Sequence, residues 1–469
     1  MNRVVWALLI ILVIYGLALR IYDLEGQSLW NDEAVSMGAA HDLIDNGFDS
    51  DLFRHPGQYP SMSLLNASIL AGSIFVFGDT VFALRFPAVV FGTLMIPLVF
   101  YFTRRLTKDE IVALVATALI TFLMVEVSWA RSARMYQGFQ FFFLLSLCLL
   151  WIGHQSHRPH LLVPLGVAVV LTVFMHRLGL LLLPVFVLYF LGAEYERIKH
   201  NLRLFAVMAL GVGSVAVLSY VVLDLSVDIG DRIGVTSWME YYRDSLLLSL
   251  NVLVVLALVG ICFMVTRIRR AAVLLFIAFW FPLYVLSVHY THGSGDRFLY
   301  AMVPVLVITA AYAVVLVPRR LASGRPLRVM AFVVIVGLIL LVGDIALVPR
   351  TSYHGFDRSL HVSNMKSAYE FVNENQGQDD VVVNMWGGLE EMYLDQDPEY
   401  YLAGTGFMRS NSTYLFKGEL EELVQTGTGW VVVDMGGSYM RGIDPVLATL
   451  DLVYTADNGT PDYAWVYHW

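Results

Sequence analysis

Long apolar stretches dominate the first three quarters of the chain. A helix needs about 20 mostly apolar residues to cross the hydrocarbon core of a bilayer. Stretches near that length lie close to 4–20, 61–77, 82–102, 110–127, 138–152, 161–175, 178–192, 203–223, 244–266, 271–288, 298–317 and 328–348. The first has only Arg3 before it and no small-residue cleavage site after it, so we expect a retained span rather than a removed signal peptide.

The basic loops decide how these stretches thread the membrane. If every stretch crosses from a cytoplasmic N-terminus, the basic clusters fall outside, against the positive-inside rule. If 61–77, which contains Asn66 and Gly72, enters the outer leaflet without crossing, all basic loops fall inside. These are the loops around Arg104, Arg158, Arg197, Arg267 and Arg319. The pattern therefore predicts an α-helical polytopic membrane protein with about 11 spans plus a re-entrant or juxtamembrane helix.

The apolar runs end near residue 348, and a different pattern follows. An amphipathic helix is expected over 363–375 and another helix over 414–426. Buried strands are expected over 380–386, 429–434 and 463–469. Residues 349–469 therefore form a small α/β domain. The predicted topology places it outside the cell, together with a long first outer loop at 21–81 of the 1–348 body.

Composition excludes several classes of protein. The chain is 58% hydrophobic and 15% charged, against about 45–50% and about 25% for soluble proteins, so a water-soluble enzyme and a disordered chain are excluded. Two cysteines, both in apolar runs, exclude a disulfide framework and a Cys-based zinc site. The net charge of −9 argues against a nucleic-acid partner. Membrane lipids are the expected surroundings, and without a Gly-rich phosphate loop any reaction must take its free energy from an activated donor.

Two neighbouring acids open the first outer loop's helix. Asp32 and Glu33 follow Trp30, whose ring suits the membrane interface. A partly desolvated carboxylate there can act as a general base on an acceptor hydroxyl or amine. On the local residues alone, the better explanation of both acids is that they open a helix over 32–44, whose dipole they favour.

Three arginines and several neighbours gather on the same predicted side. Arg131 and Arg134 are three apart and share a helix face, and Arg297 opens another span. Arginine at this depth is costly unless it meets an anion. That anion is either a lipid phosphate reached by snorkelling or the phosphate of a bound ligand. His55 could donate a hydrogen bond to a phosphate or be an ordinary loop residue, and the sequence favours neither explanation. His176 faces the same predicted side of the membrane.

The acidic and histidine clusters do not define a metal site. The DxD patterns at 49–51 and 395–397 are short enough to arise by chance. His289 and His292 with Asp296 could bind a metal, but a polar turn between spans explains them better. We therefore assign no metal ligand and no cofactor, and leave a divalent cation open.

Five stretches together resemble a known family. Leu29-Trp30-Asn31-Asp32-Glu33-Ala34 resembles the W-x-D-E-A first-loop motif of the glycosyltransferase C superfamily. The resemblance is closest to prokaryotic relatives of protein O-mannosyltransferases and of the lipid A aminoarabinose transferase. The other matches, in family order, are His55-Pro56, the run 83–92 followed by Arg104-Arg105, the A-R-M-Y element at 133–136, and 296–299 with Pro304. The resemblance covers about the first 310 residues.

The resemblance implies a membrane glycosyltransferase with its active site at the outer face of the plasma membrane. It would move a sugar from a polyprenyl- or dolichyl-phosphate carrier to a glycan, lipid or protein acceptor. Asp32 would be the base or acceptor-positioning group. Glu33 is the other catalytic candidate, although neighbouring helical positions point about 100° apart and only one of the two can face the site. The substrate-binding candidates are His55, Tyr59, Arg131, Arg134, Tyr136, His176 and Arg297.

Departures from the family pattern limit this reading. Pro-Gly replaces Pro-Pro after His55, which weakens the role of that histidine. The second acidic motif of oligosaccharyltransferases after Arg134 and their WWDxG signature are absent from the sequence, which argues against whole-glycan transfer to Asn. The alternative is a transporter or flippase of lipid-linked sugars. Transporters tend to contain two related halves, and the sequence shows no internal repeat.

Overall fold

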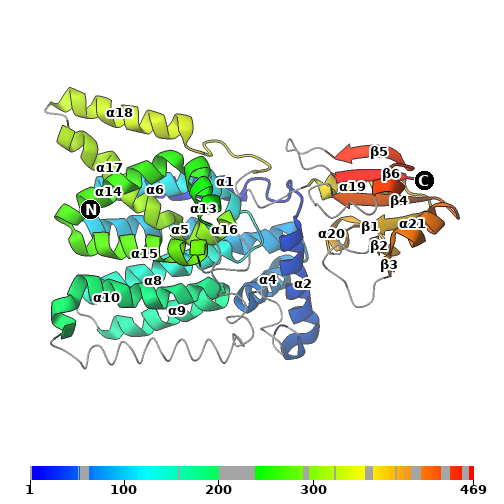
Figure 1. The fold of residues 1–469 in the computed structure, drawn as a ribbon, viewed down its shortest axis with the longest axis horizontal. Helices are drawn as coiled ribbons and strands as arrows, with labels where there is room; N and C mark the ends of the chain where they lie inside the picture. Colours follow the sequence, from blue (N-terminus) through cyan, green and yellow to red (C-terminus); the bar gives the residue numbers. More distant parts are fainter. Residues whose placement is uncertain are drawn as a thin grey trace.

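The structure is a computed structural model with a helical body at one end and a small sheet domain at the other (Figure 1). It describes residues 3–50, 52, 63–156, 159–199, 238–288, 295–321, 324–353, 363–385, 388–396, 398–402, 413–434, 444–456 and 464–469. The predicted span 203–223 lies outside these residues, as do His55, Tyr59, His289 and His292.

Helices occupy each predicted apolar segment within the described residues. They are α1 (Arg3–Ile21), α4 (Leu64–Phe77), α5 (Val81–Thr107), α6 (Glu110–Phe122), α7 (Met124–Trp129), α8 (Tyr136–Ser156), α9 (Leu162–Met175), α10 (Leu182–Lys199), α13 (Met239–Ser249), α14 (Asn251–Arg267), α15 (Arg269–Val288), α16 (Asp296–Leu299), α17 (Val303–Leu321) and α18 (Arg325–Val342). Short 3-10 turns lie at η1 (Gly47–Asp49), η2 (Pro159–Leu161), η3 (Arg177–Leu181) and η4 (Tyr300–Met302). Helix α2 (Asn31–Asn46) lies across the end of the body that faces the sheet domain (Figure 1).

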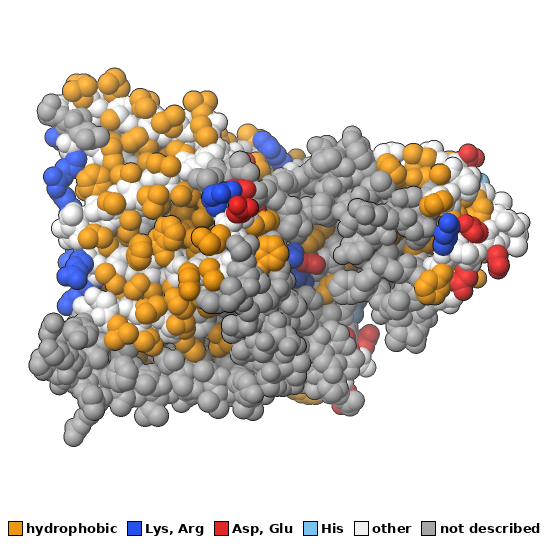
Figure 2. All heavy atoms as spheres, in the orientation of Figure 1, with side chains coloured by type: hydrophobic (Ala, Val, Ile, Leu, Met, Phe, Trp, Pro, Cys, Tyr) orange, Lys and Arg blue, Asp and Glu red, His pale blue; other side chains and the backbone are white. Residues whose placement is uncertain are grey.

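Six helices of the described residues are long and apolar enough to cross a membrane, and the bent pair of α13 and α14 would make a seventh. This confirms the predicted polytopic helical body, while the count of eleven spans stays a prediction. Helix α4 has 14 residues, which at 1.5 Å per residue is about 21 Å and too short to cross the core. Hydrophobic side chains cover the body, and Lys and Arg gather at the end farthest from the sheet domain (Figure 2).

The segment predicted as one helix over 110–127 is broken at Leu123. This residue leaves the helical region (φ −63°, ψ 126°) and forms an antiparallel bridge with Ile345. The Met124 N–H donates to the Asp344 carbonyl at 2.8 Å, and the Ala346 N–H donates to the Phe122 carbonyl at 2.7 Å. Backbone groups freed by the break therefore find partners without water, as a membrane interior requires. The bridge also ties α7 to the chain that leads into the sheet domain.

The buried guanidinium of Arg20 satisfies the end of α6. It donates to the Ile120 carbonyl at 3.1 Å and to the Thr121 carbonyl at 3.2 Å, which are among the last carbonyls of that helix and have no intrahelical partner. Gly92 leaves the room for this arrangement, because a Cβ there would lie 2.5 Å from Ala130 Cβ and 3.0 Å from Arg20 Nε. Helices α1, α5 and α6 are thereby held in close contact at this end.

The C-terminal part forms a sheet with strand order β3-β2-β1-β4-β6-β5. Its strands are β1 (Val381–Asn384), β2 (Tyr400–Leu402), β3 (Tyr414–Leu415), β4 (Gly429–Asp434), β5 (Asp451–Ala456) and β6 (Ala464–His468). Strands β1 to β4 pair in parallel, and β6 and β5 add antiparallel pairs. Four helices accompany them, namely α19 (Met365–Asn375), α20 (Glu390–Tyr393), α21 (Lys417–Val424) and α22 (Asp444–Leu447). Sequence analysis missed β2, β3 and β5, because two are very short and the third is a mostly exposed edge strand.

The sheet domain and the body share one apolar cluster. Leu29 and Met37 from the first loop and α2 pack with Tyr369 of α19 and Leu389. Polar contacts border the cluster: the Leu29 N–H donates to the Tyr393 hydroxyl at 2.9 Å. The domain is therefore seated directly on the loop that carries the candidate acids.

A histidine on α2 connects three segments at this interface. His41 Nε2 lies 3.0 Å from Asp79, and Nδ1 lies 3.7 Å from Glu391 of α20. The neighbouring carboxylates, Glu391 first and Asp79 second, raise the pKa of His41 to about 9. At pH values between about 6.5 and about 9, the His41 ring is therefore protonated in the folded protein but mostly neutral in the unfolded chain.

We expect His41→Gln to lower stability in a pH-dependent way. Because the folded-state pKa lies above the ordinary value of about 6.5, the cation's contribution is complete below about pH 6.5 and is lost as the pH rises through about 9. Allowing for solvent screening of this half-buried group, the difference should be on the order of 1 kcal/mol at pH 6 and near zero at pH 10. Thermal unfolding of the purified protein measures it, with the exposed His160→Gln as control. A difference that is equal at both pH values would contradict the assignment.

Candidate active site

The carboxylate of Asp32 lies between two arginines from distant parts of the chain. Asp32 is in the first turn of α2, where unpaired N–H groups and the helix dipole favour an acid. Its Oδ2 is 3.1 Å from Arg297 Nη1 and 3.4 Å from Arg134 Nη2. The Asp32 and Arg297 side chains are 26% and 23% exposed, whereas Arg134 is 2% exposed. One arginine therefore faces outward and the other is buried behind the acid.

Arg134 is fixed in position by contacts to α2. Its Nη1 donates to the Asp32 carbonyl at 2.7 Å and to Ser36 Oγ at 2.8 Å. The guanidinium also lies over the ring of Tyr136, 5.9 Å from its centroid. The arginine is thus preorganised, because its position depends on the backbone of α2 as well as on the Asp32 carboxylate.

A buried polar network holds the segment that carries Arg297. Three residues after it, the Tyr300 hydroxyl lies 2.9 Å from Glu126 Oε2 and 2.5 Å from Gln137 Oε1. Gln140 Nε2 donates to Glu126 Oε1 at 2.7 Å and to the Tyr300 carbonyl at 2.9 Å. The network joins α7, α8 and η4. Sequence analysis did not assign it a role, although an acid between apolar runs is the signal that could have found it.

His176 forms part of the wall beside the arginines. It follows α9, and its Nδ1 accepts the Leu178 N–H at 3.1 Å. Its ring centroid lies 5.7 Å from that of Tyr136 and 6.1 Å from that of Phe298. The structure therefore brings together five of the predicted residues: Asp32, Arg134, Tyr136, His176 and Arg297.

Glu33 takes a different position from its neighbour. Its side chain is 1% exposed and pairs with Arg85 of α5. Oε1 accepts from Arg85 Nε at 2.9 Å and from the Ala133 N–H at 2.7 Å, and Oε2 accepts from Arg85 Nη2 at 2.7 Å. Adjacent helical residues point about 100° apart, so only Asp32 reaches the more open side.

Arg85 has every N–H donor satisfied in this pair and its surroundings. Beyond Glu33, it donates to the carbonyls of Leu24, Gln27 and Ser28 at 2.9, 2.8 and 3.0 Å. Sequence analysis included Arg85 only within the motif at 83–92. Burying an arginine inside an apolar helix costs free energy, and such a residue is a signal of a functional position. It holds the first loop against α5 immediately before Asp32.

Arg131 lies apart from the arginine pair. It donates to the carbonyls of Tyr22, Asp23 and Thr351 at 2.5, 3.1 and 2.8 Å, and its guanidinium lies over Tyr353. It therefore connects the end of α1 to the chain that enters the sheet domain. His55 and Tyr59 fall outside the described residues.

No three His, Cys, Asp or Glu side chains of the described residues form a group that could hold a metal ion. The site's chemistry within those residues comes from one carboxylate and two guanidiniums. Guanidinium groups bind phosphate oxygens through paired, charge-assisted hydrogen bonds. The fold and the site thus define a multi-pass membrane protein with a carboxylate held between two guanidinium groups.

Comparison with known proteins identifies the fold. The family described as dolichyl-phosphate-mannose-protein mannosyltransferase matches residues 61–223. No curated protein sequence matches the chain. ArnT from Cupriavidus metallidurans bound to undecaprenyl phosphate superposes with a TM-score of 0.58 at 12% identity, covering 100% of this chain and 98% of that one. The oligosaccharyltransferase AglB from Archaeoglobus fulgidus, in complex with an inhibitory peptide and a dolichol-phosphate, gives 0.56 at 15% identity, covering 82% and 62%.

The chain therefore has the fold of the glycosyltransferase C superfamily, and the resemblance predicted from its motifs is confirmed. It spans less than two thirds of the length of the archaeal enzyme.

We expect removal of either partner of the Glu33–Arg85 pair to destabilise the protein strongly. Glu33→Gln or Arg85→Gln leaves an uncompensated buried charge, which costs about 3–5 kcal/mol. The double variant should recover part of this loss, because neither charge remains. Thermal unfolding of the four proteins gives the coupling.

The more exposed pair of Glu110 with Arg104, at 3.1 Å, is the matched control. Glu110→Gln should cost no more than about 1 kcal/mol. Fully additive losses at Glu33 and Arg85 would show that the two side chains do not act as a pair.

Proposed function

We propose that the protein is an integral-membrane glycosyltransferase that moves a sugar from a polyprenyl- or dolichyl-phosphate carrier to a glycan, lipid or protein acceptor. The observation that carries this proposal is the Asp32 carboxylate between Arg134 and Arg297. The fold supports it, because ArnT was solved with undecaprenyl phosphate and AglB with dolichol-phosphate. These relatives do not favour the alternative of a transporter or flippase.

The two arginines would bind the carrier phosphate. Arg297 is partly exposed and Arg134 is fixed in place, so the phosphate would displace the Asp32 carboxylate from a preformed guanidinium pair. Both cations would then stabilise the negative charge that grows on the phosphate as its bond to the sugar breaks. Tyr136 and His176 would complete the wall of this subsite.

Asp32 would act on the acceptor. Released from the arginines by the phosphate, its carboxylate takes the proton of the acceptor hydroxyl or amine as that group attacks the anomeric carbon. The bond from the anomeric carbon to the phosphate oxygen breaks, and the carrier phosphate leaves with both electrons. One in-line displacement of this kind inverts the configuration of the sugar. Glu33 and Arg131 act as positioning residues, since their partners hold them away from this centre.

The site and the sheet domain would face the outside of the plasma membrane. Exposed Lys and Arg side chains gather at the opposite end of the body (Figure 2), and cytoplasmic loops carry an excess of these residues. Lipid-linked sugars would then reach Asp32 from the outer leaflet.

We expect Asp32→Asn and Arg297→Ala to separate chemistry from carrier binding. Asp32→Asn cannot take a proton, so transfer should fall by about 10²–10⁴-fold. Its affinity for undecaprenyl phosphate should hold or rise, because both guanidiniums lose a competing anion. Arg297→Ala should weaken that affinity by roughly 10–150-fold, the loss of one or more charge-assisted bonds. Transfer from a panel of radiolabelled polyprenyl-phosphate sugars and binding of undecaprenyl phosphate are the two measurements.

Arg350→Ala, on an exposed arginine near the sheet domain, is the matched control and should change neither quantity. If Asp32→Asn transfers sugar at the wild-type rate, Asp32 is excluded as the base. Unchanged affinity in Arg297→Ala would remove the phosphate assignment.

We also expect that the two ends of the protein are accessible to reagents from opposite sides of the membrane. After Cys148 and Cys262 are replaced by alanine, a cysteine at Lys417 of α21 should react with an impermeant thiol reagent in intact cells. A cysteine at Lys108 should react only after the cells are opened. The reverse pattern would invert the proposed orientation.

A further inference from the structure

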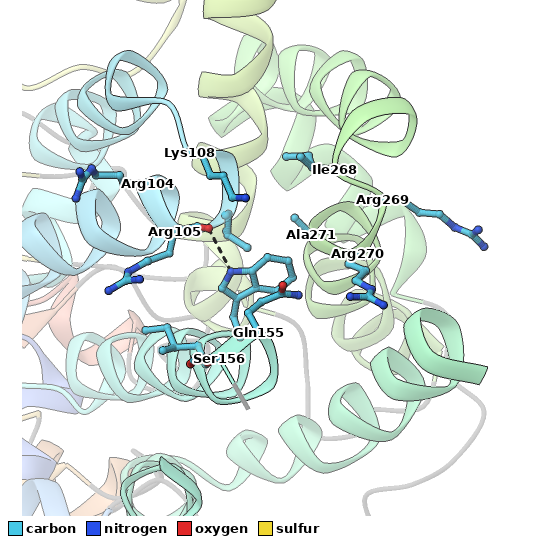
Figure 3. Close-up of a pocket in the computed structure, with 12 residues that line it drawn as sticks. Arg104, Arg105, Lys108, Gln155, Ser156, Ile268, Arg269, Arg270 and Ala271 are labelled. Atoms are coloured by element: carbon cyan, nitrogen blue, oxygen red, sulfur yellow. Dashed lines mark hydrogen bonds between the residues drawn. The ribbon is translucent and has the colours of Figure 1, made fainter. Parts of the chain in front are cut away.

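A second charged site lies at the end of the body opposite the sheet domain. A cavity of about 580 Å³ opens there between the ends of α5, α8 and the turn from α14 to α15. Its lining residues include Arg104, Arg105, Lys108, Gln155, Arg269 and Arg270. Figure 3 shows them, with Lys108 and Gln155 near the middle and Arg104 and Arg269 on opposite sides.

The lining carries five basic side chains and no acidic one. Arg104 is partly neutralised by Glu110, at 3.1 Å. Within the described part of the chain, Arg105, Lys108 and Arg269 form no ion pair with an acid. These side chains are long and exposed, and Arg105 and Arg269 extend toward opposite sides of the cavity (Figure 3), so a bound anion between them could draw them inward.

The local backbone also points toward an anion. Lys108 is one of two non-glycine residues of the described chain with a positive φ, at 57°, where glycine is usually favoured after a helix. Its main-chain N–H closes α5 by donating to the Arg104 carbonyl at 2.9 Å. Residues Arg269 and Arg270 begin α15, a helix of 20 residues whose N-terminal end carries partial positive charge. Lys108 and the N-terminal end of α15 thus lie at one cavity, together with the C-terminal ends of α5 and α8, whose partial negative charge favours the basic residues there.

The surroundings of the cavity favour a lipid over a soluble anion. Trp151 lines it with its indole N–H held by the Arg105 carbonyl at 3.3 Å, a placement suited to the membrane interface. Leu106, Ile152 and Ile268 continue the lining with apolar surface. Below the rim, Tyr101 and Val265 are 40% and 51% exposed, so the cavity opens beside the lipid-facing surface. Basic pockets between helices at this level suit phosphate headgroups with attached acyl chains.

We propose that this cavity binds the phosphate headgroup of an anionic phospholipid in the leaflet opposite the Asp32 site. Arg105, Lys108 and Arg269 supply the charge, Gln155 and Ser156 supply neutral polar groups, and Trp151 borders the start of the acyl chains. The site is separate from the proposed transferase centre and does not depend on that function. Its occupancy would anchor the α14–α15 turn to the end of α5.

Native mass spectrometry of the full-length protein tests this site with cardiolipin and phosphatidylglycerol as probes and phosphatidylcholine as the neutral reference. The wild type should retain the anionic lipids preferentially. Lys108→Gln and Arg269→Gln should each weaken retention about fivefold, equivalent to about 1 kcal/mol for each lost cation, and the double variant about 25-fold. Arg325→Gln, an exposed arginine at the start of α18 outside the cavity, should leave retention unchanged.

Lys108→Gly separates binding from folding. Glycine removes the charge but relieves the positive φ, so thermal stability in detergent should be maintained or should rise while lipid retention falls. Equal retention in the wild type and the double variant would overturn the proposal. Inorganic pyrophosphate bound through Lys108 and Arg269 without selective retention of anionic lipid would equally overturn it in favour of a soluble ligand.

Discussion

The buried pair of Glu33 and Arg85 is the interaction on which the rest of the site depends. Two charges removed from water must satisfy each other and their neighbours, and here the five N–H groups of Arg85 all find acceptors. Glu33 also accepts the Ala133 N–H at 2.7 Å, immediately before Arg134. The same pair therefore fixes the first loop, α5 and the chain that delivers the buried arginine to Asp32.

Asp32 occupies the position between two guanidinium groups that the proposed function assigns to the carrier phosphate. In the described structure, its carboxylate is the counter-ion of both Arg134 and Arg297, so the two cations are held in place without a ligand. An incoming phosphate would compete for the same N–H donors and would free the carboxylate to meet the acceptor. Under the proposed function, carrier binding and activation of the base are thereby one event.

The sequence predicted the helices well, because their length and apolar composition follow from the thickness of the membrane. The family resemblance named Asp32 as the base, but the sequence could not show what holds Glu33 away from the site, because its partner Arg85 is 52 residues away. Sequence analysis placed Arg131 with the phosphate ligands. It could not find the carbonyl groups that Arg131 actually contacts, because partners such as Thr351 lie as far as 220 residues away. The break at Leu123 depends in the same way on the distant residues 344–346.

The shared apolar cluster has a consequence for how the protein is made. Leu29 is synthesised early, but its packing partner Tyr369 of α19 emerges some 340 residues later. At about 5–20 residues per second, the first loop waits roughly 15–70 s before its apolar surface is covered. During that interval the part of this apolar surface that α19 later covers is exposed beside the membrane, although Leu70 and Leu84 of the same cluster are already present.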